Sequence, residues 1–173
     1  MKVNGFLLQQ AIKRWELRRD TASNQFSDTL FKFKDETKAS PDSVFKDFVT
    51  AEDAIVKLET AQAKYNLKVI VDLAPGRQMT LTEAVKRLGG AGRGEKMWKT
   101  ATNPKKDRYG YGSPTERTSN TERATYVLST SEMMSRADKA AQSTGLLRAA
   151  IARGNGTEFD AADIGLEPAL LTE

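Results

Sequence analysis

Two stretches decide the fold of this chain: residues 8–33 read LQQAIKRWELRRDTASNQFSDTLFKF, and residues 48–69 read FVTAEDAIVKLETAQAKYNLKV. In each stretch, one set of positions recurs at alternating steps of three and four residues. The positions are Leu8, Ile12, Trp15, Arg19, Ala22, Phe26, Thr29 and Phe33 in the first stretch, and Phe48, Ala51, Ile55, Leu58, Gln62, Tyr65 and Val69 in the second. Residues three and four apart share one face of an α-helix, so this spacing predicts two long helices that each present a continuous face to a neighbour.

The segment between the two stretches favours a reversal of the chain. Residues 34–39 form a polar connector, and Ser40-Pro41 follows it. Serine is a good N-cap, and proline suits the first helical position because the N–H that it lacks would be unsatisfied there. We therefore predict a long antiparallel hairpin, with one helix over residues 4–33 and the other over residues 41–66. Its large side chains are expected to pack together: Phe45, Phe48, Ile55, Leu58 and Tyr65 on Trp15, Phe26 and Phe33.

The chain changes character after residue 66. Val69, Ile70 and Val71 favour a short strand, and the turn residues 74–76 close it. A second apolar segment, residues 124–128 (ATYVL), is predicted to pair with residues 67–73. Residues 102–120 lie between them and are rich in Pro, Gly, Ser and Thr, which is typical of a loop.

Two capping boxes mark the starts of further helices. Thr80-x-x-Glu83 precedes a third helix, and Ser129-x-x-Glu132 precedes a last helix that runs to residue 153, with Gly154 as its stop. Four glycines within residues 89–94 (GGAGRG) predict a break or distortion of the third helix, since each interior glycine costs about 1 kcal/mol relative to alanine. The buried face of the last helix is predicted to hold Met134, Ala137, Ala141, Thr144, Leu147 and Ile151.

Together these patterns predict a mainly α fold. It consists of a long antiparallel helical hairpin, two further helices, a small two-stranded β element and an extended C-terminal tail. The predicted division is a helical bundle domain over residues 1–154 and an acidic C-terminal arm over residues 155–173.

Several short runs along the chain occur in a recognisable order. They are residues 76–84 (GRQMTLTEA), Arg108-Tyr109 in the loop, and residues 127–130 (VLST), which lead into a helix with Ala137-Asp138. Over roughly residues 6–158, this order resembles the septicolysin-like bacterial proteins of unassigned function. The resemblance implies a helical bundle with a small β element, and it implies no catalytic residues. The glycines at 89–94 and the acidic tail depart from the family pattern.

The composition excludes several classes of chemistry. The 173 residues contain no cysteine and no histidine, which rules out disulfides, thiolate metal sites and nucleophile systems that need imidazole. An enzyme that uses carboxylates remains an alternative, although no spacing gathers acidic residues at one place. We therefore expect a non-enzymatic protein without catalytic residues, cofactor or metal. The sequence has no apolar run of 18 residues and no secretory signal, so we expect no membrane partner and a cytoplasmic or virion location.

Charge is distributed unevenly along the chain. The whole protein carries +4, but residues 155–173 hold five acidic and no basic residues, which leaves +9 on the remainder. An acidic, partly apolar tail on a basic body predicts that the tail docks on a body, its own or that of a neighbour. Our leading hypothesis is a structural subunit that forms a homo-oligomer, alone or with other assembly subunits, in a multi-copy particle such as a phage virion. The tail is expected to clasp a neighbouring subunit, and its residues expected at this oligomer interface are Phe159, Ile164, Leu166, Leu170 and Leu171.

A basic segment supports the alternative of nucleic-acid binding. Residues 86–108 hold eight basic and two acidic residues, and aromatic residues lie among or beside them. Basic groups neutralise phosphates and aromatic rings stack on bases. The candidate residues are Lys96, Trp98, Lys99, Lys105, Lys106, Arg108, Tyr109 and Tyr111. The neighbouring glycines do not form a nucleotide-binding phosphate loop, because the sequence lacks the Gly-Lys-Ser/Thr ending that binds phosphate and magnesium.

Overall fold

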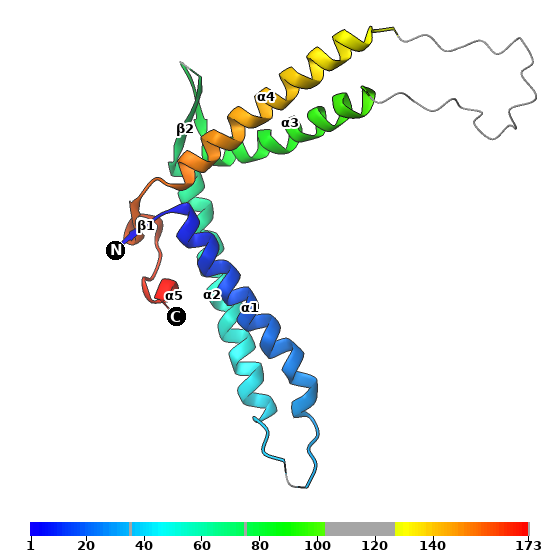
Figure 1. Ribbon diagram of the computed structural model, residues 1–173. Helices are drawn as coiled ribbons and strands as arrows, with labels where there is room; N and C mark the ends of the chain where they lie inside the picture. Colours follow the sequence, from blue (N-terminus) through cyan, green and yellow to red (C-terminus); the bar gives the residue numbers. More distant parts are fainter. Residues whose placement is uncertain (35, 75, 103–126, 173) are drawn as a thin grey trace, which may run out of the picture. The chain divides into compact units, whose positions relative to one another are not determined.

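The computed structural model describes residues 1–34, 36–74, 76–102 and 127–172, and it is mainly helical (Figure 1). The elements in chain order are β1 (Lys2–Val3), α1 (Gly5–Thr29), α2 (Pro41–Lys68), β2 (Ile70–Ala74), β3 (Arg77–Thr80), α3 (Leu81–Ala101), α4 (Thr130–Asn155), β4 (Phe159–Asp160), the 3-10 helix η1 (Ala161–Ile164) and α5 (Ala169–Thr172). They form two compact units. Unit 1 comprises residues 1–84 and 150–173, and unit 2 comprises residues 85–149. The predicted division at residue 154 therefore differs from the division into compact units.

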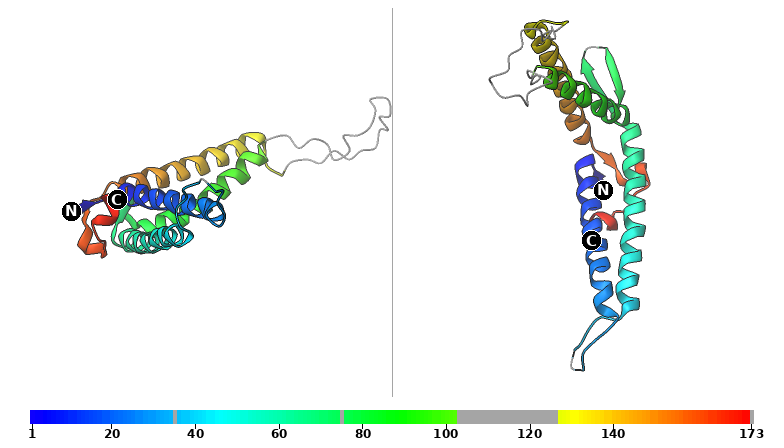
Figure 2. Two further views of the ribbon diagram at one scale, coloured as in Figure 1. Left: turned by 90° about the horizontal axis from the view of Figure 1, so that it is seen from below. Right: turned by 90° about the vertical axis from the view of Figure 1, so that its right-hand side faces the viewer.

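The predicted helical hairpin is confirmed as the framework of unit 1. Helices α1 and α2 run antiparallel and side by side, as both views in Figure 2 show. Their 4-3 faces meet in the core, where the buried side chains include Leu8, Ile12, Trp15, Ala51, Ile55, Leu58 and Tyr65. The side chain of Asn4 caps α1, and Ser40 caps α2 with Pro41 in its first turn, as the sequence indicated for α2.

The hairpin is less tightly packed near its connecting loop than the sequence suggested. Helix α1 ends at Thr29, so Phe33 lies outside it and is 72% exposed. The ring of Phe45 is also exposed, and it contacts the half-buried Phe26 at a centroid distance of 6.2 Å. The predicted packing of Phe45 on Phe26 is therefore confirmed, although Phe45 stays exposed, whereas Phe33 lies beyond the helix and outside the core. A 4-3 spacing gives a common face, but it does not specify where along that face the two helices stop burying side chains.

The two sheets differ from the predicted pairing. Strand β2 pairs antiparallel with β3, with Val71 opposite Met79, and not with residues 124–128. Of that segment, residues 124–126 lie outside the described residues, and Val127 and Leu128 are in a bend rather than a strand. A tight hairpin brings β2 and β3 together, with Gly76 in the left-handed conformation at φ 78°. The second sheet, which the sequence did not predict, joins β1 to β4 with Val3 opposite Phe159.

Helices α3 and α4 run alongside each other in unit 2 (Figure 1). The capping box of α3 is confirmed by the hydrogen bond from the Glu83 amide to Thr80 Oγ1 at 3.2 Å. That of α4 is confirmed by the bond from the Ser129 amide to the Glu132 carboxylate at 2.9 Å. The predicted break at residues 89–94 was wrong, because α3 is continuous from Leu81 to Ala101.

Helix α4 also differs in detail from the prediction. It continues through Gly154 to Asn155, so Gly154 is not its stop. Its buried face contains Met133 rather than Met134, together with the predicted Ala137, Thr144 and Leu147. The predicted loop over residues 102–120 lies almost entirely outside the described residues.

Candidate functional site

The predicted interface residues of the tail lie on the hairpin of their own chain. Ile164, Leu166 and Leu170 are buried in the core of unit 1, and Phe159 and Leu171 pack against it half-buried. The indole Nε1 of Trp15 donates a hydrogen bond to the Leu170 carbonyl at 3.1 Å. The C-terminal segment therefore completes the hairpin core of the same molecule.

Charge pairs accompany this apolar contact. Lys57 lies 3.2 Å from the Glu167 carboxylate, and Lys68 donates to the carbonyl of Asp163 at 2.5 Å. Lys2 pairs with Asp160 at 3.0 Å beside the β1–β4 sheet, and this hydrogen bond lowers the pKa of the Asp160 carboxyl. The acidic tail thus docks on basic residues, as its composition indicated, and in this structure the body is its own.

Tyr65 fastens the end of α4 to the hairpin. Its hydroxyl is 2.7 Å from the carbonyl oxygens of both Gly154 and Thr157, and its ring meets Phe159 edge-on at 5.6 Å. Burial raises the pKa of this hydroxyl, so Tyr65 stays protonated at neutral pH and can donate to these carbonyls. Gly154 lies so close to β2 that an added Cβ would be 2.6 Å from Val71 Cγ1.

Unit 2 contains one charged group that is largely withdrawn from solvent. The side chain of Glu95 on α3 is 12% exposed, and Lys99 one turn later pairs with it at 2.6 Å. The hydrogen bond from Lys99 lowers the pKa of the Glu95 carboxyl, and the side chain of Thr144 on α4 lowers it further. Glu95 is therefore ionised at neutral pH, and through Thr144 it links α3 to α4.

The predicted nucleic-acid residues are only partly described. Lys96 and Lys99 are exposed, and Trp98 is half-buried with the guanidinium of Arg136 over its ring at 5.2 Å. The other five, Lys105, Lys106, Arg108, Tyr109 and Tyr111, lie outside the described residues. Unit 2 as a whole carries 13 Lys and Arg residues against 6 Asp and Glu residues, a net charge of +7, whereas unit 1 carries 14 against 17, a net charge of −3.

Helix α3 has a second 4-3-4 face on which the described residues bury no side chain completely. It consists of Gly90, Gly94, Met97 and Ala101, and we call it the glycine seam. An added Cβ at Gly90 or Gly94 would meet nothing within 4 Å, and Met97 is 73% exposed. No residue of α3 after Ala84 is fully buried. The sequence shows these glycines, but the predicted helix break did not indicate that Gly90 and Gly94 would lie on one face of a continuous helix.

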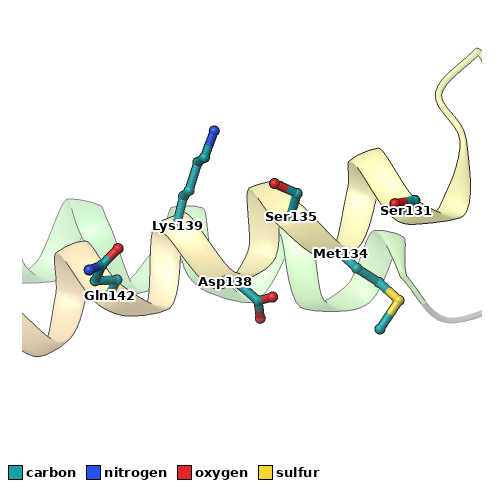
Figure 3. A pocket seen from close by; sticks show the side chains of 6 residues that line it. All are labelled: Ser131, Met134, Ser135, Asp138, Lys139 and Gln142. Carbon is teal, nitrogen blue, oxygen red and sulfur yellow. The ribbon is translucent and has the colours of Figure 1, made fainter.

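A hollow of about 780 Å³ lies beside α4, but its lining residues all project from that one helix and do not converge, as Figure 3 shows for Lys139 and Asp138. Within the described ranges, no three acidic side chains gather where they could hold a metal ion. None of the described helices has the length and apolarity needed to cross a bilayer.

Comparison with protein-family models, curated proteins and solved structures finds no match to this chain.

Proposed function

We propose that this protein is a non-enzymatic structural subunit that self-associates, with the glycine seam of α3 as a contact between copies. A multi-copy particle, such as a phage or virion component, is the setting that we propose for it.

The observation that carries the proposal is the lack of burial along α3. Its four glycines together weaken the isolated helix by about 3–4 kcal/mol relative to alanine. Most helical stability in proteins comes from packing an apolar face, and beyond Ala84 this helix buries no side chain completely. A second helix against the glycine seam would supply the missing packing, because glycines let two backbones approach closely. The 4-3-4 spacing is the one that keeps such a neighbour in contact along the helix.

The test replaces a seam glycine by a large side chain. Leucine has a far better helix propensity than glycine, so Gly94→Leu should strengthen α3 as an isolated helix while wedging the seam apart. We expect sedimentation velocity to show a smaller assembly for Gly94→Leu than for the natural sequence. The matched control is Gly89→Leu, which places the same side chain on the same helix outside the seam and should leave the assembly intact. Equal sedimentation of both variants and the natural protein would contradict the proposal.

The charge of unit 2 supports nucleic-acid binding as a second candidate. Lys86, Arg93 and Lys96 share one side of α3, and none has an ion pair within the described residues. A gel-shift titration tests this function: binding should fall steeply as salt rises, and charge reversal at Lys105 and Lys106 should abolish it. Binding that is insensitive to salt would exclude the candidate.

A further inference from the structure

Three cations stand in line along α3. Lys86, Arg93 and Lys96 share one side of the helix, all three are exposed, and we call them the cationic stripe. Lys86 precedes Glu95 by about two and a half helical turns, and the Glu95 carboxylate contacts Thr144 of α4. The stripe therefore begins on the side of α3 opposite α4.

Glycines leave the surface of α3 low between the cations of the stripe. Gly89 stands between Lys86 and Arg93 on the same side of the helix, and an added Cβ there would be 3.7 Å from the guanidinium Nη1 of Arg93. At the neighbouring Gly90, an added Cβ would meet nothing within 4 Å. A phosphate group can therefore approach the helix closely here, because no side chain holds it away from the cations.

The aromatic residue that the sequence suggested for base stacking lies away from the stripe. Trp98 is the one aromatic residue of α3, and it stands two residues, or about half a turn, beyond Lys96. It is half-buried, and the guanidinium of Arg136 lies over its ring at 5.2 Å. Proteins that bind single strands combine a basic surface with aromatic rings on which bases stack. The cationic stripe offers charge without such a ring, which favours contact with a phosphate backbone over contact with unstacked bases.

The charge of the stripe favours nucleic acid over an acidic protein as its partner. Between Lys86 and Lys96 the only acidic residue is Glu95, whose charge is already paired with Lys99 at 2.6 Å. Lysine is depleted at protein–protein interfaces, whereas protein–DNA interfaces are strongly positive. From Lys86 to Lys96 the helix rises about 15 Å, and a duplex presents a negative charge about every 1.7 Å along its axis. All three cations of the stripe can therefore contact phosphates of one duplex at the same time.

We infer that the cationic stripe binds the phosphate backbone of double-stranded nucleic acid. This inference rests on the second candidate function, nucleic-acid binding, and it names both the site and the form of the ligand. The duplex is held by the charges of α3, and neither Trp98 nor any other ring stacks on its bases. Because duplexes of different sequence share the same backbone, the affinity should depend little on base sequence.

The test measures how binding depends on salt. The full-length protein is titrated against a fluorescently labelled DNA duplex of mixed sequence, and against one of its single strands, by fluorescence anisotropy at several salt concentrations. Each phosphate contact to a duplex contributes about 0.9 to the slope of log affinity against log salt, so Lys96→Gln should reduce that slope by about 0.9. The matched control is Lys139→Gln, which removes the same charge from unit 2 at an exposed position of α4, about half a turn from the buried Ala137. The control should leave the slope unchanged.

The outcomes separate this inference from the function on which it rests. Tighter binding of the duplex than of the single strand, with a reduced slope for Lys96→Gln alone, is the expected result. Equal slopes for the two variants, or tighter binding of the single strand, would overturn the inference while nucleic-acid binding stands. A protein that binds neither probe, even at low salt, overturns both and leaves an acidic protein surface as the partner to test.

Discussion

Trp15 and Leu170 are 155 residues apart in the sequence, yet the indole N–H of the first donates to the carbonyl of the second at 3.1 Å. This bond joins the C-terminal segment to α1, and the segment covers the half of the α1–α2 hairpin that lies nearer the chain termini. The chain therefore covers the hairpin near its own termini, whereas an open hollow lies between α1 and α2 nearer the connecting loop.

The C-terminal segment should stabilise the monomer. Ile164 is fully buried in the core of unit 1, so Ile164→Ala should lower the free energy of unfolding by about 2–5 kcal/mol. Val56→Ala, at an exposed position of α2, is the control and should change it by less than about 0.5 kcal/mol. Urea denaturation followed by circular dichroism measures both. Equal midpoints for the two variants would show that the tail does not belong to this core.

The hydroxyl of Tyr65 should contribute measurably to stability. In Tyr65→Phe, the Gly154 carbonyl loses the Tyr65 hydroxyl at 2.7 Å but keeps the Thr157 amide at 3.1 Å, so the change removes a hydrogen bond worth about 0.5–1.5 kcal/mol. We expect a loss of that size in urea denaturation, with the same slope as the natural protein. A midpoint that does not move would mean that the Thr157 amide alone satisfies the Gly154 carbonyl, and that Tyr65 anchors α4 only through its ring.

Two glycines of α4 should respond to alanine in opposite directions. At Gly154, a new Cβ would be 2.6 Å from Val71, so Gly154→Ala should destabilise unit 1 by about 1–3 kcal/mol. At Gly145 a Cβ would meet nothing within 4 Å, so Gly145→Ala should stabilise the helix by up to about 1 kcal/mol. Thermal melts compare the pair. Stabilisation by both substitutions would contradict the close approach of α4 to β2.

The pKa of Glu95 should depend on Lys99. The hydrogen bond with Lys99 lowers this pKa below the ordinary value of 4.5, so the associated stability is present above that value and is lost as pH falls through the lowered pKa. Lys99→Met should raise the Glu95 pKa, as measured by carbon-13 NMR of the carboxyl group. Lys96→Met removes a neighbouring lysine that has no ion pair with Glu95 and should leave the pKa in place. An equal effect of both substitutions would mean that only the general positive charge of α3 matters.

The hairpin was predictable because its signals are local and repeated. A 4-3 spacing sustained over several turns specifies a helix face, and Ser40-Pro41 specifies where α2 begins. The capping boxes at Thr80 and Ser129 were equally reliable, since each needs only residues within one turn. The buried positions Leu8, Ile12, Leu58 and Tyr65 follow from the same spacing.

The remaining features depend on contacts between distant residues. The pairing of β1 with β4 joins two strands of two residues each, too short to leave a pattern. The choice of β3 as partner of β2 depends on the tight turn at Gly76, which competes with any distant strand. The continuity of α3 through its glycines contradicts local helix propensity, so the sequence pattern could not indicate it.

The most direct test of self-association is the mass of the full-length protein in solution. Light scattering after size-exclusion chromatography, at low and at high salt, should give a multiple of the 19.1 kDa chain mass. That multiple should persist at high salt, because the proposed seam is apolar and joins copies of unit 2, each of which carries +7, so that salt screens their repulsion. A mass of 19.1 kDa at both salt concentrations, over the micromolar range, would contradict self-association and leave nucleic-acid binding by unit 2 as the function to test.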